Sequence, residues 1–385
     1  MRIFLFLAAV FLAQLCFAQA PELVIPIGHS DNITCIAISA DNKIIASGGW
    51  DKSVKLWDMA GNKELKTIGN FSSWIKAIAI SPDGKKLVTG ANKELRVNDI
   101  SKGCKEIFKQ SVSVGDINSI CFSPDGKYIA TSGFGVDGNN KSVEEVKIWD
   151  AATMALVGRT QTGERIKNIR FQNDDELLVI HYLSISTINL NTGLITKVET
   201  FKNIITELSP DGKIFASEGW DNDPKVASDD PNDPITFSKG RAILDIVDRN
   251  TDKVIKQFIG QTSSIKHAVF SNDGRYVLSA AGVNIYIYDL QEMKFSGKFD
   301  EKLAAAEALT FTRDGKKLIT GHGDKIIMVW DFEGRKLAQK MGGEANLINN
   351  ITSAPNGSVR VNDTTNVNRI ALTNLPLCQI ALEVN

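Results

Sequence analysis

The chain has 385 residues, with 44 lysines and arginines against 45 aspartates and glutamates, so its formal net charge is −1. This balance lacks the basic excess typical of nucleic-acid binding, and no basic amphipathic run suggests a membrane surface. The length exceeds the usual size of one hydrophobic core, a limit that repeat folds escape because each unit packs only on its neighbours.

The first 18 residues have the pattern of a secretory signal. Arg2 precedes an apolar run from Ile3 to Ala13, and apolar character resumes up to Ala18. The run is short for a membrane span, so we expect cleavage after Ala18 and export to the periplasm or the extracellular space. Residues 19–385 would then form a single domain. An uncleaved anchor is the alternative, and no later segment is long and apolar enough to span a bilayer.

A short motif returns eight times along the rest of the chain. In each copy an apolar stretch runs into a turn built on Asp-Gly or a close relative. The clearest copies are Ile75–Gly84, Ile117–Gly126 and Ile265–Gly274, and weaker ones end at Asn42, Asp175, Gly212, Gly315 and Gly357. Most copies lie about 42 residues apart, which indicates a repeat architecture.

The first unit predicts four short strands joined by tight turns. The expected strands are Ile33–Ser39, Ile44–Ser47, Val54–Asp58 and Lys63–Ile68. A small antiparallel sheet of this kind cannot bury both faces alone, so it must stack on copies of itself. We therefore expect an all-β chain that forms a closed β-propeller of four-stranded antiparallel blades. The eight turn motifs favour eight blades, with seven as the alternative.

The amino-acid sequence of the units resembles that of the WD-repeat (Trp-Asp repeat) family. The resemblance lies in Gly28-His29, Lys55-Leu56-Trp57-Asp58, Ile148-Trp149-Asp150 and Val329-Trp330-Asp331. It implies a structural hydrogen-bonded network of His29, Ser47, Asp51 and Trp57 in the first unit, and of Thr320, Asp324 and Trp330 in the seventh. The likeness to a catalytic triad is superficial, because such a network satisfies buried polar groups and fixes a turn.

Closure of the ring requires a final strand. Leu23–Ile27 lies where a fourth strand would precede the first unit, and we favour it as the closing strand of the last blade. Its Pro26 lacks one ladder donor, which an edge position tolerates. Leu377–Val384 competes for the same place, at the end of an eighth unit that spans Leu347–Val384.

Two units carry extra residues between their second and third strands, Phe134–Glu145 and Trp220–Gly240. In the family these connections share one face with the loops that join blades, and loops on a rigid scaffold often bind partners. The candidate partner-binding residues on this face are Trp50, Trp74, Phe134, Trp220 and His322. Tryptophan is enriched at interface hot spots. The alternative is that each ring packs down on its own blade.

The sequence contains no recognisable catalytic or metal-binding motif. Its four histidines lack metal-ligand spacing, and no nucleophile elbow or phosphate-binding loop occurs. Five aspartates within residues 221–233 could hold calcium, but prolines interrupt them, so we interpret this segment as a solvated loop. The cysteines after residue 18 are Cys35, Cys104, Cys121 and Cys378; we expect Cys35 and Cys121, within strand patterns, to be buried free thiols.

These observations predict an exported, non-catalytic propeller that serves as a monomeric scaffold for protein partners. We expect no catalytic residue, cofactor or metal, and no nucleic-acid partner. A propeller enzyme or a glycan-binding module that uses the central channel is the alternative. A purely structural part of an envelope assembly is a third possibility.

Overall fold

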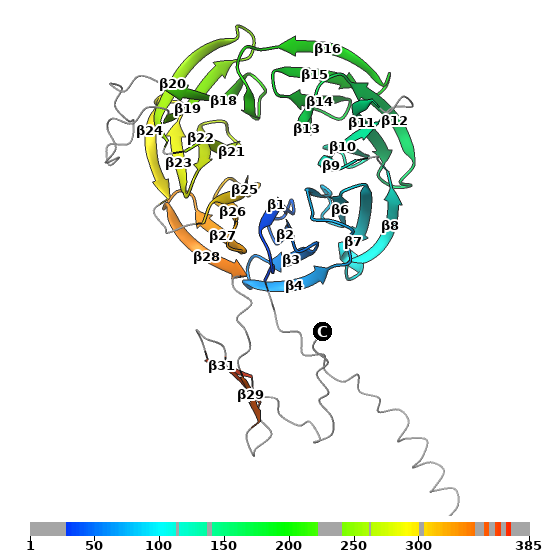
Figure 1. Cartoon of the computed structure of the whole chain (residues 1–385), viewed down its shortest axis with the longest axis vertical. Helices are drawn as coiled ribbons and strands as arrows, with labels where there is room; N and C mark the ends of the chain where they lie inside the picture. Colours follow the sequence, from blue (N-terminus) through cyan, green and yellow to red (C-terminus); the bar gives the residue numbers. More distant parts are fainter. Residues whose placement is uncertain are drawn as a thin grey trace, which may run out of the picture.

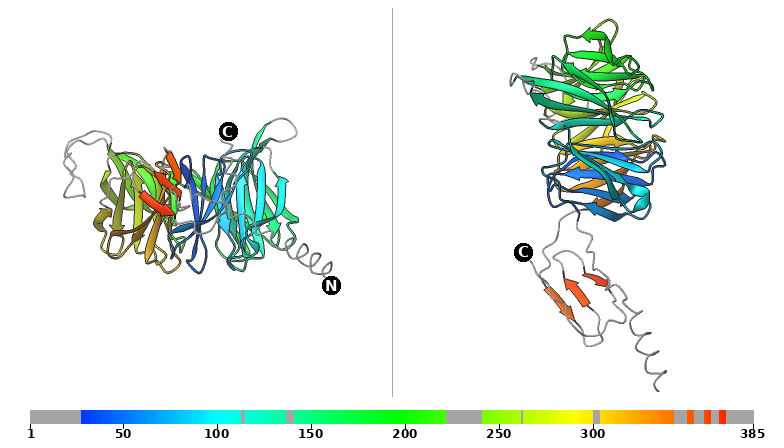
Figure 2. Two further views of the ribbon diagram at one scale, coloured as in Figure 1. Left: turned by 90° about the horizontal axis from the view of Figure 1, so that it is seen from below. Right: turned by 90° about the vertical axis from the view of Figure 1, so that its right-hand side faces the viewer.

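The computed structural model describes residues 28–112, 115–136, 141–221, 241–261, 263–299, 304–342, 350–353, 359–362 and 367–370. Residues 28–342 form seven four-stranded antiparallel sheets arranged as the blades of a closed ring (Figure 1). Side views show the ring edge-on (Figure 2). The predicted β-propeller is confirmed with the alternative number of blades, and the preference for eight was wrong.

The strands of each blade follow one another in the sequence, from the centre of the ring to its outer wall. Blade 1 contains β1 (Ile33–Ile38), β2 (Ile44–Gly49), β3 (Val54–Asp58) and β4 (Lys63–Ile68). Blade 2 contains β5 (Ala77–Ile80), β6 (Lys86–Ala91), β7 (Glu94–Asp99) and β8 (Lys105–Ser111), with the short 3-10 helix η1 (Ile100–Lys102) before β8. Blade 3 contains β9 (Ile117–Phe122), β10 (Tyr128–Val136), β11 (Ser142–Asp150) and β12 (Leu156–Thr162).

The same order holds in the remaining blades. Blade 4 contains β13 (Ile166–Phe171), β14 (Glu176–His181), β15 (Ser184–Asn189) and β16 (Leu194–Thr200). Blade 5 contains β17 (Ile205–Leu208), β18 (Ile214–Asp221), β19 (Arg241–Asp248) and β20 (Lys253–Gln261). Blade 6 contains β21 (Ile265–Phe270), β22 (Tyr276–Ala281), β23 (Asn284–Asp289) and β24 (Lys294–Phe299). Blade 7 contains β25 (Ala306–Phe311), β26 (Lys317–His322), β27 (Ile326–Asp331) and β28 (Lys336–Gly342).

The ring closes by direct packing of blade 1 on blade 7. β1 contacts β25 and β26, and one apolar cluster joins Ile33 and Ile45 of blade 1 to Ile319 and Ile327 of blade 7. No space therefore remains between these blades for an eighth. β28 supplies the fourth strand of blade 7, so this blade needs no strand from elsewhere.

The region predicted as the eighth unit contributes a three-stranded sheet of its own. β29 (Asn350–Ser353), β30 (Val359–Asn362) and β31 (Val367–Ile370) pair with one another and with no described strand of the ring. The sequence Pro355-Asn356-Gly357 matched the repeat motif, but the strands on either side of it offer few large apolar residues for a blade to bury. Both proposed closing strands, Leu23–Ile27 and Leu377–Val384, lie outside the described residues.

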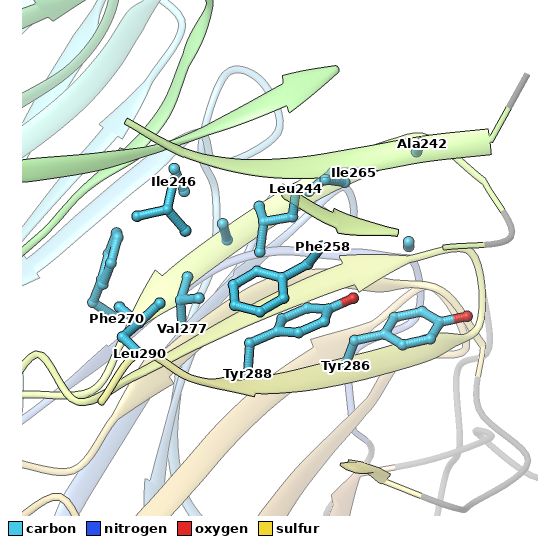
Figure 3. Close-up of a cluster of buried hydrophobic side chains, with 13 residues drawn as sticks. Ala242, Leu244, Ile246, Phe258, Ile265, Phe270, Val277, Tyr286, Tyr288 and Leu290 are labelled. Atoms are coloured by element: carbon cyan, nitrogen blue, oxygen red, sulfur yellow. The ribbon is translucent and has the colours of Figure 1, made fainter. Parts of the chain in front are cut away.

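Each apolar core lies between two neighbouring blades. At the junction of blades 5 and 6, Leu244 and Ile246 from β19 face Val277 from β22 (Figure 3). Phe258 from β20 stacks on Tyr288 from β23, with ring centroids 4.3 Å apart. A blade thus buries on its neighbours the faces that it cannot bury on itself, as the repeat pattern requires.

The predicted polar network of blade 1 is present. The His29 Nδ1–H group donates to Asp51 Oδ2 at 2.9 Å, and the Ser47 hydroxyl donates to His29 Nε2 at 2.7 Å. The Trp57 indole donates to the same Ser47 Oγ at 2.8 Å. Burial alone would raise the pKa of Asp51, but hydrogen bonds led by that from His29 outweigh it and lower the pKa to about 2. Ser47 is fully buried, so no substrate can reach its hydroxyl.

The network depends on a tryptophan at the penultimate position of the third strand. Trp149 and Trp330 donate to Thr131 and Thr320, which occupy the place of Ser47 in blades 3 and 7. In blades 2, 5 and 6 the tryptophan is replaced by asparagine, valine or tyrosine. The corresponding buried hydroxyls have no hydrogen-bond partner among the described residues; they belong to Thr89, Ser217 and Ser279.

Blade 7 differs from the predicted network in two respects. His322, predicted to face a partner, is fully buried, and that prediction was wrong. Its Nε2 accepts from the Thr320 hydroxyl at 2.6 Å and its Nδ1–H donates to the Ala304 carbonyl at 2.9 Å, so it takes the role that His29 has in blade 1. Asp324 Oδ1 is buried without a hydrogen-bond partner among the described residues, and this carboxylate acts on His322 only through its charge.

Two serines at equivalent positions provide a matched test of this network. Ser47→Ala would leave His29 Nε2 and the Trp57 indole without their partner, and we expect a loss of about 2–4 kcal/mol in the free energy of unfolding. Ser279→Ala removes a buried hydroxyl that bonds to nothing described, so stability should stay within about 0.5 kcal/mol or increase. Denaturant unfolding of the two variants and the parent measures both values. Equal losses would contradict the structural role given to Ser47.

Candidate functional site

Two sets of connections meet on one face of the ring. These are the connections between second and third strands and those that join each blade to the next. The Trp50 amide donates to the Asn32 carbonyl, the Phe134 amide to the Asp116 carbonyl and the Ile205 amide to the Tyr182 carbonyl. In each bond, one residue lies in or near a connection after a second strand, and the other lies in or near a connection between blades. We call this face, made of the two sets of connections, the upper rim.

Two predicted site residues are in contact on the upper rim. Trp50 lies between β2 and β3, and Trp74 lies between β4 and β5. Their ring centroids are 5.5 Å apart with the planes inclined by 35°. Trp50 is 53% exposed and Trp74 is half-buried, so the pair presents an aromatic surface to solvent. Neither ring packs wholly on its own blade, which was the alternative prediction.

The aromatic surface continues across blades 2 and 3. Lys76 Nζ lies 4.8 Å from the centroid of the Trp74 ring, a cation–π contact, and 2.5 Å from Asp116 Oδ2. The carbonyl of Asp116 accepts the amide of Phe134, whose side chain is exposed. We call Trp50, Trp74, Lys76 and Phe134 the tryptophan patch.

The remaining predicted rim residues give a mixed result. Trp220 is the penultimate residue of β18, and its side chain lies outside the described residues. The acidic loop proposed as a calcium site falls almost wholly on residues 222–240, which also lie outside them. His322 belongs to the buried network described above and not to the rim surface.

A second aromatic cluster on the upper rim was missed from the sequence. Tyr182, Leu183 and Ile204 are exposed apolar side chains next to blades 4 and 5. Arg165 and Lys167 lie over the Tyr182 ring, 6.0 and 5.8 Å from its centroid. We call these five residues the tyrosine patch. Tyr182 follows the second strand as Trp50 does, but blade 4 lacks the Trp-Asp signature that would have revealed this equivalence.

A buried carboxylate lies between the two patches. Glu144 in β11 is only 6% exposed, and neither of its carboxylate oxygens forms a hydrogen bond of good geometry with a described residue. Burial raises the pKa of Glu144, against the opposing effects of the Ile166 amide and the charges of Arg165 and Lys76. Glu144 therefore lies within electrostatic reach of a cation from each patch. Unpartnered buried carboxylates are costly, and they are found where function retains them.

The alternative site, at the centre of the ring, offers few groups that could bind a ligand or a metal. A cavity of about 290 Å³ opens between blades 4, 5 and 6. Arg170 lines it and donates to the carbonyls of Leu208 and Ser209 at 3.1 and 2.9 Å. Glu207 also lines it, and burial raises its pKa. Across the described ranges, no group of three or more histidine, cysteine and acidic residues could hold a metal.

The cysteines of the ring are free thiols. Cys35, Cys104 and Cys121 are half-buried and form no disulfide, and Cys378 lies outside the described residues. Burial raises the pKa values of Cys35 and Cys121 to about 12, so both thiols stay protonated and unreactive. In the part of the chain that the structure describes, no helix has the length and apolar character needed to cross a membrane.

Glu144 gives a pH-dependent test of the rim. Because its pKa in the folded state is raised, the ionised form opposes folding above its ordinary pKa of about 4.5. Glu144→Gln should therefore raise the midpoint of thermal unfolding by a few degrees at about pH 7.5, and this gain should vanish as the pH falls to about 4. Scanning calorimetry at both pH values measures it. Glu333→Gln, at an exposed position, is the control and should change neither; a gain that is independent of pH would refute the assignment.

Comparison with known proteins identifies the repeats. The family model described as "WD domain, G-beta repeat" matches residues 21–58, 62–99, 104–141 and 298–331. The second match runs from β4 through β7, so the sequence repeat is offset from the blade by one strand.

Two similar proteins share part of the chain. They are the small ribosomal subunit protein RACK1 of Drosophila melanogaster, 29% identical over 134 residues, and the small ribosomal subunit protein RACK1y of Oryza sativa subsp. japonica, 29% identical over 126 residues. These matches cover 34% and 32% of this chain and only 38% and 34% of the relatives' own lengths. Together, the matched repeats and the ring of seven blades show a β-propeller that contains WD repeats.

Proposed function

We propose that this chain is an exported, non-catalytic scaffold that binds protein partners through the upper rim. The observation that carries the proposal is the contact between Trp50 and Trp74, with Trp50 more than half exposed. A large apolar ring held in solvent brings no benefit to the folded monomer, whereas tryptophan dominates the binding energy of many interfaces. Protein binding is the use that best explains this arrangement.

The distribution of exposed apolar residues supports the rim over the outer wall. Aliphatic side chains are also exposed on fourth strands, two or three to a strand in β12, β16 and β20, but no aromatic ring is exposed among them. Exposed aliphatic residues are normal on protein surfaces. On the rim, by contrast, aromatic rings contact each other and neighbouring cations across blade boundaries.

The export part of the proposal rests on the first 18 residues. Their basic start and short apolar run favour secretion, with the propeller acting as a monomer outside the cytoplasm. The relatives' names refer to the ribosome, but their matches cover about a third of each relative. We therefore infer from these relatives only that the chain contains the repeat, and we do not infer that it binds the ribosome.

The double variant Trp50→Ala/Trp74→Ala tests the rim directly. Partners are first captured from the exported fraction with the parent protein, purified and used to measure dissociation constants. Loss of both rings should weaken binding about 30-fold or more, as expected for hot-spot residues. Leu194→Ala, at a site 65% exposed on β16, is the matched control and should leave affinity unchanged. Unaltered affinity of a folded double variant would exclude the tryptophan patch as the binding site.

A further inference from the structure

We infer that the upper rim of blades 1 to 4 binds an acidic segment that carries apolar side chains, within a protein partner. The inference rests on the proposed function and adds the chemical class of the partner. It is argued from the charges on the rim and from their placement between the tryptophan and tyrosine patches.

Unpaired positive charges are distributed along this part of the rim. Four exposed cations there form no ion pair with any described residue. They are Lys52 after β2, Lys93 after β6, Arg165 after β12 and Lys202 after β16. Each comes from a different connection, so the charges lie along the rim and not at one point.

The negative charges of the same rim are mostly engaged. Asp51 belongs to the buried network, Asp116 is paired with Lys76, and Glu144 is buried. Only Asp31 and Glu164 are exposed acids among the described rim residues of blades 1 to 4, and each accepts a hydrogen bond. The accessible charge is therefore positive, although the whole chain carries a formal charge of −1.

The other side of the ring provides a comparison. Lys266 at the start of β21 lies 2.6 Å from Glu307 at the start of β25, so this rim cation is neutralised within the ring. Glu218 accepts the amide of Ile265 at 2.8 Å. Lys325 of blade 7, between β26 and β27, has no ion pair with a described residue but is only half-exposed. Among the described rim residues, the exposed cations without an ion pair lie near blades 1 to 4, where the exposed aromatic rings also lie.

Apolar and cationic groups alternate along this surface. In chain order the rim presents Trp50, Lys52, Trp74, Lys93, Phe134, Arg165 and then Tyr182, whose ring lies beside Arg165. An extended segment has side chains that alternate in direction, so one that combines carboxylates with apolar groups matches both kinds of site. Rim cations of this kind contribute through attraction during encounter and through selection against positively charged partners.

A nucleic acid also has negative charge and stackable rings, but the observations favour a protein. Neutralising a phosphate backbone requires a dense basic surface, and a basic domain as a whole is typical of such proteins. Here the exposed rim cations without an ion pair number four among the described residues, they lie in separate connections, and the chain has no basic excess. A single-stranded DNA probe is included in the test for this reason.

The test uses fluorescence anisotropy with three labelled peptides of about twelve residues. The first alternates glutamate with phenylalanine and leucine, the second has lysine in place of every glutamate, and the third has serine in place of every apolar residue. The full-length protein should bind the first peptide at least about tenfold more tightly than the other two, and raising the salt from about 50 to 300 mM should weaken this binding.

Charge reversal then locates the site. Lys93→Glu/Lys202→Glu should weaken the first peptide about five- to tenfold. Lys63→Glu/Lys253→Glu reverses two exposed lysines on the outer strands β4 and β20 and should have no effect. Circular dichroism confirms that both variants are folded.

The remaining outcomes separate failure of the acidic-segment inference from failure of the proposed function. Equal binding of the lysine peptide, no measurable binding of any peptide, or tighter binding of an oligothymidylate overturns the acidic-segment inference. If binding of captured partners depends on Trp50 and Trp74 but not on Lys93 and Lys202, the proposed function stands and this inference fails. If captured partners ignore all four residues, the proposed function itself fails.

Discussion

A four-stranded sheet has two faces to bury and cannot bury either on itself; this constraint determines the structure. Each apolar cluster is shared by neighbouring blades, as where Phe258 of blade 5 stacks on Tyr288 of blade 6. The same packing joins Ile33 of blade 1 to Ile319 of blade 7 and closes the ring. Because the blade faces are buried against each other, residues available for binding are confined to the rims, the channel and the outer wall. The exposed aromatic rings among the described residues, Trp50, Phe134 and Tyr182, lie on one of these, the upper rim.

The polar networks show how much irregularity the ring tolerates. Blades 1, 3 and 7 satisfy the hydroxyl of the second strand with an indole, whereas Ser217 and Ser279 keep buried hydroxyls with no described partner. Apolar packing between blades must therefore hold these units without the network. In blade 1 the arrangement of Ser47, His29 and Asp51 has the geometry of a reactive triad, but it is buried and its serine is bonded to an indole. Geometry alone does not make a nucleophile when no substrate can approach it.

The sequence was informative wherever local chemistry determines local structure. Strand alternation, Asp-Gly turns and the Trp57 network were all predicted, because they depend on residues within one unit. The count of eight blades failed since turn residues such as those at 355–357 are recognisable without the apolar faces that a blade must bury. His322 was misplaced because a residue at the end of β26 was read as a loop. The contact of Trp50 with Trp74 depends on how two blades meet, and a pattern confined to one unit does not contain this information.

The buried polar network of blade 1 also holds the turn that carries part of the proposed binding surface. Asp51, fixed by His29, also accepts the backbone amides of Ser30 and Ser53, both at 3.0 Å, and so holds the turn that carries Trp50. The amide of Trp50 is itself held by the Asn32 carbonyl at 2.9 Å. A ring presented on a fixed backbone loses less conformational entropy on binding than one on a free loop. The buried network of blade 1 would therefore contribute to the proposed recognition without touching the partner, because it determines where the exposed Trp50 is placed.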